Sequence, residues 1–248
     1  MKIEAVTTCV RYTDYLAHTI LWNKQHFDNL VVVTDKADTW TQNLCEHHWT
    51  KCVVTDAFYA NERAFVKSAG INAGLASLDC DGWIVHIDAD IVLPPRTREL
   101  LGRAVRDPET IYGIDRLNVT SFEDWLLYLS HPEIQFGKIG FVNFNCFPIG
   151  TRVVPEEGWS PIGFFQMWNP RSSGRFVYPD HGAADRSDME FSRQWPREKR
   201  QLIPEIIGLH LGTPRPKGGG MGVNWRGRVS QPFGPVPEIL VRQELKSY

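Results

Sequence analysis

The chain has 248 residues, which is enough for one large α/β domain or two small ones. Its composition, 42% hydrophobic and 23% charged, is ordinary for a soluble globular protein. The net charge of −2 excludes a general attraction to nucleic acid or acidic membranes, so any basic binding site has to be local. No apolar run approaches the ~18 residues of a membrane span, and five cysteines without a Cys-x-x-Cys pair indicate reduced thiols. We therefore expect a cytoplasmic protein.

Strands and helices alternate through the first 95 residues. Apolar, β-branched runs predict strands at 3–10, 30–34 and 51–55. Helical spacing of apolar residues predicts a helix between the first two strands and a second helix over 61–78, with Asn61 as its N-cap. Strand, helix and strand within about 35 residues are typical of a parallel sheet.

The stretch 83–95, WIVHIDADIVLPP, predicts a buried strand that ends before two prolines. Its carboxyl end brings Asp88 and Asp90 to the sheet edge where open α/β folds bind ligands. Residues two apart in an extended chain point to the same side, so both carboxylates can share one cation or ligand. Because they repel each other unless a positive charge lies between them, a divalent ion carrying a diphosphate would suit them. The alternative is a solvated strand end.

The second half of the chain is more irregular. A helix over 97–105 is followed by a predicted strand at 110–119, a helix beginning at Ser121, and strands at 140–150 and 162–170. Twelve of the sixteen prolines lie from Pro148 onward, which indicates many loops. Four tryptophans in this half could fill the core or stack on sugar rings: Trp159, Trp168, Trp195 and Trp225.

Four stretches in a fixed order carry a specific resemblance. They are FVKSAGINAGLAS (65–77), GWIVHIDADIVLPP (82–95), SDMEFSRQW (187–195) and IGLHLG (207–212). This ordered set resembles the GT-A glycosyltransferases, nucleotide-sugar-dependent enzymes with a single Rossmann-like domain. The resemblance implies an α/β domain over 1–248 with a mostly parallel central sheet flanked by helices. Residues 1–105 would be the nucleotide-sugar-binding half, and residues 106–248 the loop-rich acceptor half.

The resemblance also assigns a metal site. Asp90 would bind the ion directly, Asp88 would hold the ribose or the ion, and His210 would be a further ligand. Oxygen and imidazole ligands together favour Mn²⁺ over Mg²⁺. The alternative for His210 is a packed core histidine.

Three further residues would bind the nucleotide. Thr8 and Asp35 follow the first two strands, where such folds bind the base and ribose. Asp35 could accept a hydrogen bond from a uracil N–H, or it could equally cap a helix. Lys67 could reach the diphosphate or could be an ordinary solvated lysine.

A general base is expected at the start of a late helix. By resemblance Asp188 is the first choice and Asp185 the second, although Ser187 replaces the acidic residue that commonly precedes this aspartate. Capping of the helix is the alternative role. A dedicated base favours a single in-line displacement, which inverts the anomeric centre.

The segment 210–228, HLGTPRPKGGGMGVNWRGR, is rich in glycine and basic residues. It resembles the mobile loop that closes on the donor in GT-A enzymes, and Lys217 and Arg228 would then contact the diphosphate. Eight basic residues against two acidic ones between Arg193 and Arg228 exceed what one diphosphate requires. A polyanionic acceptor, including nucleic acid, is therefore open.

We expect a metal-dependent hexosyltransferase-type enzyme that moves a sugar from a nucleoside-diphosphate sugar to an acceptor hydroxyl. UDP-sugar is the default donor because the family uses it most. The acceptor could be a glycan, a protein, a metabolite or a modified DNA base. The first alternative, a sugar-phosphate nucleotidylyltransferase, is disfavoured because TTCVRYTDY after the first strand contains no glycine. The second is a non-catalytic nucleic-acid-binding module.

Overall fold

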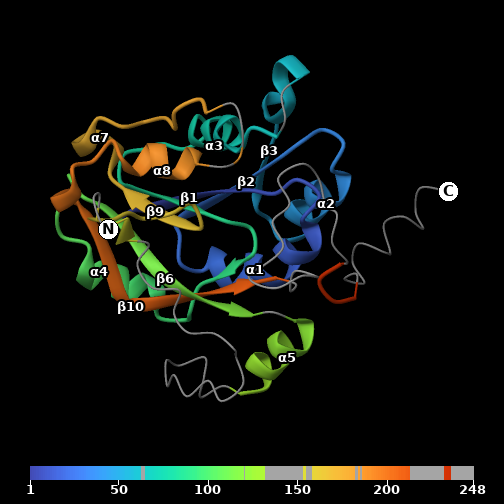
Figure 1. Cartoon of the computed structure of the whole chain (residues 1–248). Coiled ribbons are helices and arrows are strands. Elements are labelled where there is room, and N and C mark those ends of the chain that lie inside the picture. The colour runs from blue at the N-terminus through green and yellow to red at the C-terminus, as the bar shows by residue number, and fades with distance from the viewer. Residues whose placement is uncertain are drawn as a thin grey trace.

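The computed structural model describes residues 1–62, 65–119, 121–131, 153–154, 158–181, 184, 186–212 and 232–235. An eight-stranded sheet runs through the molecule, with helices on both faces (Figure 1). The strand order is β3 (Lys51–Val54), β2 (Asn29–Thr34), β1 (Ile3–Thr8), β4 (Trp83–Ile87), β9 (Phe165–Trp168), β6 (Ile111–Val119), β10 (Arg200–Leu211) and β5 (Ile91–Val92). A separate two-stranded ribbon pairs β7 (Val153–Val154) with β8 (Gly158–Trp159). The expected mostly parallel sheet flanked by helices is confirmed.

The first part of the chain builds the parallel side of the sheet. Its elements are β1 (Ile3–Thr8), α1 (Thr13–Lys24), β2 (Asn29–Thr34), α2 (Thr39–His47), β3 (Lys51–Val54), the 3₁₀ turn η1 (Ala57–Glu62), α3 (Lys67–Leu75) and β4 (Trp83–Ile87). β1 pairs in parallel with both β2 and β4, and β2 pairs in parallel with β3. Their carboxyl ends therefore lie at one edge, which we call the carboxyl edge.

The later strands extend the same sheet. The elements are β5 (Ile91–Val92), α4 (Thr97–Ala104), β6 (Ile111–Val119), α5 (Phe122–Ser130), β7 (Val153–Val154), β8 (Gly158–Trp159), β9 (Phe165–Trp168), α7 (Pro170–Ser173), α8 (Ser187–Ser192), the 3₁₀ turn η2 (Arg197–Lys199) and β10 (Arg200–Leu211). β9 lies antiparallel between β4 and β6, and β10 pairs in parallel with β6. Consequently β6 and β10 also end at the carboxyl edge.

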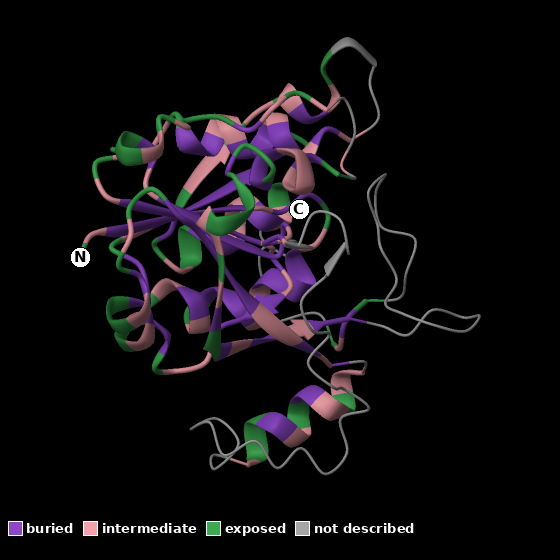
Figure 2. Ribbon diagram, turned by 60° about the vertical axis from the view of Figure 1, so that its left-hand side comes forward, coloured by how far each residue is buried: buried purple, intermediate pink, exposed green. Residues whose placement is uncertain are grey.

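Each face of the sheet has its own hydrophobic core. On one face α1, α2 and α4 pack on the strands, and on the other α3 and α8 do so. The central strands β1, β2, β4 and β9 are almost entirely buried, whereas the helices expose their outer sides (Figure 2). Trp168 and Trp195 are fully buried and so fill the core rather than offer a surface for sugar. Within the described residues, no helix has the length and apolar character needed to cross a membrane.

The helix predicted over 61–78 is wrong at its start. Residues 57–62 form η1 instead, and α3 begins at Lys67. The amide of Val66 donates to the carbonyl of Phe58 at 2.8 Å, which turns the chain before the helix. The ring of Phe58 occupies the space beside Gly70, where a Cβ would come 2.0 Å from its Cε1. The strand predicted at 140–150 lies outside the described residues.

Candidate functional site

Asp88, Ala89 and Asp90 form a tight turn at the carboxyl edge, between β4 and β5. The amide of Ile91 donates to the carbonyl of Asp88 at 3.2 Å, which closes the turn. Asp88 donates its own amide to the carbonyl of Phe164 at 3.1 Å, and the carbonyl of Asp90 accepts the amide of Leu211 at 2.8 Å. The residue just before β9 and the last residue of β10 therefore hold this turn. The extended geometry expected for the two aspartates is wrong, because the strand ends at Ile87.

The two carboxylates have different partners. Asp88 Oδ1 forms an ion pair with Lys67 Nζ, at the start of α3, and His86 Nε2 lies 3.6 Å from the same oxygen. Asp90 Oδ2 lies 3.3 Å from Nε2 of His210, near the end of β10. Asp90 Oδ1 is buried and has no hydrogen-bond partner among the described residues. The turn thus separates a lysine-paired carboxylate from one that leaves an oxygen open.

The pKa values of the two aspartates shift in opposite directions. Burial raises the pKa of Asp88, a shift that Lys67 opposes and the charge of Asp90 increases. Burial acts on Asp90 too, but the charge and hydrogen bond of His210, together with the charges of Lys67 and Arg116, outweigh it and lower the pKa of Asp90. Asp90 is therefore the member of the pair that holds its charge more firmly.

A divalent ion suits the Asp90 side of the turn. Within the described part of the chain, Oδ1 of Asp90 is an unpaired buried acceptor, and an imidazole nitrogen of His210 lies beside the other carboxylate oxygen. An oxygen and an imidazole nitrogen are donor types that Mn²⁺ accepts. Asp88 is paired with Lys67, so the ligand atoms of Asp88, Asp90 and His210 do not lie close enough together to bind one ion without rearrangement.

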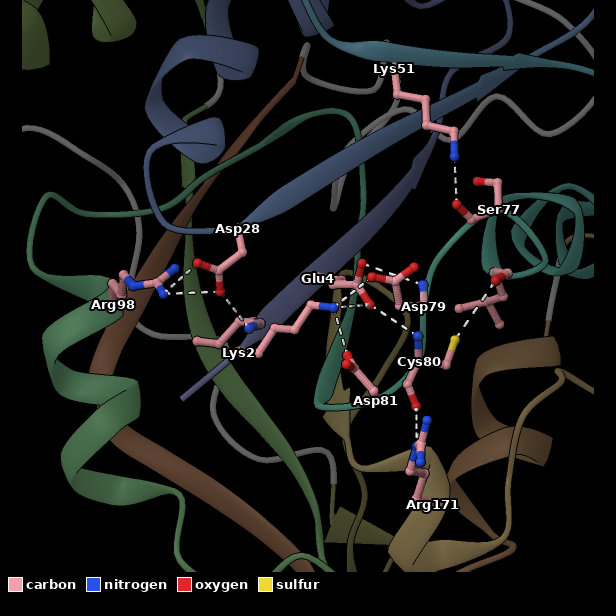
Figure 3. A network of polar contacts seen from close by, with 12 residues as sticks. Lys2, Glu4, Asp28, Lys51, Ser77, Asp79, Cys80, Asp81, Arg98 and Arg171 are labelled. Carbon is pink, nitrogen blue, oxygen red and sulfur yellow. Dashed lines mark hydrogen bonds and ion pairs between the residues drawn. The ribbon is translucent and has the colours of Figure 1, made fainter.

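Among the residues that the structure describes, one group of three metal-type ligand atoms lies within 4.8 Å of one another, at Glu4, Asp79 and Asp81. These residues lie at the opposite edge of the sheet, where β1 and β4 begin (Figure 3). Lys2 Nζ lies 2.7 Å from Asp79 and 2.6 Å from Asp81, and Glu4 accepts the amide of Cys80 at 3.0 Å. This cluster is a closed ion-pair network that ties β1 to the loop before β4.

The predicted nucleotide residues Thr8 and Asp35 also lie at the carboxyl edge, at the ends of β1 and β2. Asp35 is buried, and its Oδ1 accepts the amides of Ala37 at 2.9 Å and Asp38 at 2.8 Å. That oxygen therefore stabilises the turn before α2. The N-cap of α2 is Asp38, so the capping role considered as the alternative for Asp35 is wrong. Thr8 is partly exposed at the strand end.

Sequence reasoning missed Asp38, which joins the first two loops of this edge. Its carboxylate accepts the amide of Arg11 at 2.7 Å and the amide of Thr41 at 3.1 Å, so it caps α2. Arg11 has a positive φ of 58°, and the hydrogen bond that its amide donates to Asp38 stabilises this strained backbone conformation. The Asp-x-x-Thr spacing of an N-cap was the signal that could have identified it.

Asp188 lies in the first turn of α8 and is partly buried. Its Oδ2 accepts the amide of Gly163 at 2.6 Å, and its Oδ1 accepts the amide of Met189 at 2.8 Å. The residue at the N-cap position is Arg186, which makes no side-chain cap, so Asp188 is not the cap of this helix. Gly163 precedes Phe164, whose carbonyl binds the amide of Asp88, and this links Asp188 to the carboxylate turn.

Arg116 on β6 is a basic residue near the Asp88–Asp90 turn that the sequence reasoning did not single out. Its Cζ lies 4.5 Å from the centre of the Phe164 ring, and its charge contributes to the lowered pKa of Asp90. Two residues on, Asn118 Oδ1 lies 3.3 Å from Nδ1 of His210. The alternation of Arg116 and Asn118 with buried Leu117 was the available signal.

Asp185, Lys217 and Arg228 lie outside the described residues. Arg197 and Lys199 precede β10 and Arg200 begins it, so these residues lie at the edge away from the carboxylate turn. Lys199 pairs with Asp107 at 2.7 Å, and Arg200 donates to Ser160 Oγ at 2.9 Å. Arg200 and His210 are roughly 30 Å apart along the strand, so this segment and the carboxylate turn are not one patch.

Comparison with solved structures identifies similar proteins. A crystal structure of glucosyl-3-phosphoglycerate synthase from Mycobacterium tuberculosis, in complex with Mn²⁺ and UDP-glucose, is similar over 86% of this chain and 72% of its own, with a TM-score of 0.52 and 13% identity. A second crystal structure, of a mycobacterial protein, is similar over 86% of this chain and 68% of its own, with a TM-score of 0.50 and 14% identity. At these identities the likeness concerns the fold.

The chain has the GT-A fold. A scan against protein-family models found no match, and neither did a search of curated proteins. Within the GT-A fold, the Asp88–Asp90 turn has the place predicted from the ordered motifs, directly after β4 at the carboxyl edge. The antiparallel β9 beside it, which carries Gly163 and Phe164 just before its start, was not predicted in that position.

Proposed function

We propose that the protein is a metal-dependent glycosyltransferase that moves a sugar from a nucleoside-diphosphate sugar, UDP-sugar in the first instance, to an acceptor hydroxyl. The observation that carries the proposal is that two adjacent residues, Gly163 and Phe164, bind both Asp188 and the Asp88–Asp90 turn. Gly163 binds the carboxylate of Asp188, and its neighbour Phe164 binds the amide of Asp88. The M. tuberculosis protein of the same fold was crystallised with Mn²⁺ and UDP-glucose, which supports this class of donor.

The roles follow from the contacts. Asp90 and His210 would hold the divalent ion, with Asp88 alongside, and Lys67 would turn its ammonium from Asp88 toward the donor phosphates. A bound Mn²⁺ would offset the negative charge of the departing diphosphate as a Lewis acid. Thr8 and Asp35 border the side where the nucleoside would lie.

Asp188 would accept the proton of the acceptor hydroxyl as that oxygen attacks the anomeric carbon. The bond from the anomeric carbon to the diphosphate breaks as the new bond forms, so the anomeric centre inverts. The partial exposure of Asp188 leaves it accessible to an acceptor. Asp185, Lys217 and Arg228 remain proposed participants from the sequence motif. A reducing, cytoplasmic setting is consistent with the described cysteines, which are all free thiols.

The test is a panel of nucleotide sugars incubated with Mn²⁺, in which donor hydrolysis and transfer to candidate acceptors are measured. We expect one donor to be consumed and its nucleoside diphosphate released, and NMR of a transferred product to show the inverted linkage. Failure of every donor, together with absence of Mn²⁺-dependent nucleoside-diphosphate binding in calorimetry, would contradict the proposal. A product with the donor's own configuration would contradict inversion alone.

A further inference from the structure

A buried glutamine donates a hydrogen bond to the backbone of Asp188. Gln166, on β9, is fully buried, and its Nε2 donates to the carbonyl of Asp188 at 2.9 Å and to that of Pro161 at 2.9 Å. Its Oε1 accepts the hydroxyl proton of Tyr178. A buried amide with partners on both ends has one orientation, because any rotation would leave a polar atom unpaired.

The carboxylate of Asp188 is held by the same segment. Gly163 donates its amide to Asp188 Oδ2 at 2.6 Å. A Cβ on residue 163 would lie 2.8 Å from the Cβ of Asp188 and 3.0 Å from its Oδ2. Only glycine allows the carboxylate to come this close to the backbone. The chain from Gly163 to Gln166 therefore fixes both ends of Asp188.

This segment also determines where the Asp88 turn lies. Phe164 accepts the amide of Asp88, and Gln166 is the register partner of His86 across β4 and β9. The ring of Tyr178 lies edge-on to that of His86, with centroids 5.5 Å apart. Burial, with the charges of Asp188 and Asp88, raises the pKa of Tyr178 well above its ordinary value, so its hydroxyl stays a donor.

We propose that Gly163, Gln166 and Tyr178 are positioning residues that fix Asp188 relative to the Asp88–Asp90 turn. This rests on the proposed function, in which Asp188 is the general base. Displacement of a reacting group by about 1 Å can cost on the order of 10²-fold in rate. The three residues therefore act on turnover through Asp188 and leave donor binding to the turn.

The first experiment replaces one hydroxyl. Tyr178→Phe leaves Gln166 Oε1 unpaired without changing the packing of the ring. We expect kcat for hydrolysis of the active UDP-sugar to fall by about 10-fold or more, with KM and the Kd of UDP in Mn²⁺ within about twofold. The matched control is Tyr112→Phe, which removes a buried hydroxyl that accepts the amide of Asp107 at 2.9 Å, at the opposite end of the sheet. Its kcat should equal that of the wild type.

The second experiment is a double-mutant cycle between Gly163→Ala and Asp188→Asn, measured in single turnovers. We expect Gly163→Ala to lower kcat by on the order of 10–100-fold alone and by less than about twofold in the Asp188→Asn background. Equal losses in both backgrounds, or a Tyr178→Phe enzyme with wild-type kcat, would overturn the inference while the base role stands. An Asp188→Asn enzyme with wild-type kcat would instead overturn the base role itself.

Discussion

At the scale of single residues, the two aspartates of the turn differ in what they can bind. Lys67 neutralises Asp88, whereas Asp90 keeps one buried oxygen without a partner among the described residues. The sequence pointed to both residues because they follow a buried strand and belong to the ordered set of four motifs. It could not assign their partners, because the turn that separates them depends on backbone hydrogen bonds with Phe164 and Leu211, which are far away in the chain.

Replacing Asp90 with Asn should remove the charge at the open oxygen while keeping the side-chain volume. We expect turnover to fall by on the order of 10³-fold and the Mn²⁺ dependence of UDP binding to disappear, because the ion loses its charged ligand. Calorimetry with UDP, with and without Mn²⁺, measures this directly. The control is Asp79→Asn, which removes a largely exposed carboxylate from the closed cluster at the opposite edge and should leave both properties unchanged. Full Mn²⁺ response in the Asp90 variant would refute the metal assignment.

A buried histidine predicts acid sensitivity. Burial lowers the pKa of His26 to about 4, from an ordinary value of 6.5. Above pH 6.5 the ring is neutral in both states and contributes nothing. Between about pH 6.5 and 4 only the unfolded chain takes up the proton, so stability falls as the pH falls, by on the order of 3 kcal/mol in total.

His26→Gln should flatten this part of the curve, because the variant has no proton to bind at this position. Urea unfolding at pH 7 and at pH 4.5 measures the difference. The stability loss between these two values should shrink in the variant. An unchanged loss would mean that other groups, such as the buried His86, dominate the acid response.

At the scale of elements, the packing of α3 on the sheet depends on glycine. A Cβ on Gly74 would come 2.3 Å from Val6 Cγ2 and 2.7 Å from Val33 Cγ2, so the helix rests directly on β1 and β2. The predicted boundary of this helix failed because apolar spacing continues across residues 57–66, although Phe58 and Val66 form a turn there. Periodicity cannot distinguish a packed turn from a helix when both bury one side.

Gly74→Ala should therefore destabilise the protein by about 1–3 kcal/mol, because the methyl group has no free space. Gly102→Ala in α4 is the matched control, since apart from its chain neighbours and the nearby backbone of its own helix no atom of the described residues lies within 4 Å of the position that its methyl group would take. There the substitution should stabilise the protein by about 0.5–1 kcal/mol through helix propensity. Thermal unfolding of the two variants should shift in opposite directions, and a shift in the same direction would contradict the packing described.

At the scale of the whole molecule, a short segment near the C-terminus packs against the first helix. Phe233 is buried, stacks on Tyr15 with centroids 4.9 Å apart, and donates its amide to Asp14 Oδ2 at 2.5 Å. Its ring also meets Phe122 at 5.6 Å. Sequence patterning could not find this contact, because an isolated phenylalanine among prolines and glycines has no periodicity. The strand order beyond β4 was equally hidden, since it depends on the antiparallel insertion of β9 and on the antiparallel edge strand β5.

Phe233→Ala should lower the free energy of unfolding by about 3–5 kcal/mol, as expected for loss of a buried aromatic ring. The comparison is Phe176→Ala, where the side chain is 47% exposed and the change should stay within about 0.5 kcal/mol. Chemical denaturation of both variants measures the difference. Similar values for the two would mean that the C-terminal segment contributes little to the folded state.

The insertion of β9 between β4 and β6 has a consequence for synthesis of the chain. β4 ends at Ile87, but the strand that covers its free side, β9, ends at Trp168, about 80 residues later. At a translation rate of about 5–20 residues per second, the nascent polypeptide would present this apolar edge for several seconds. An uncovered strand edge is a template for pairing with other chains. Pairing of β4 with β9 therefore has to wait until residues 165–168 have been synthesised.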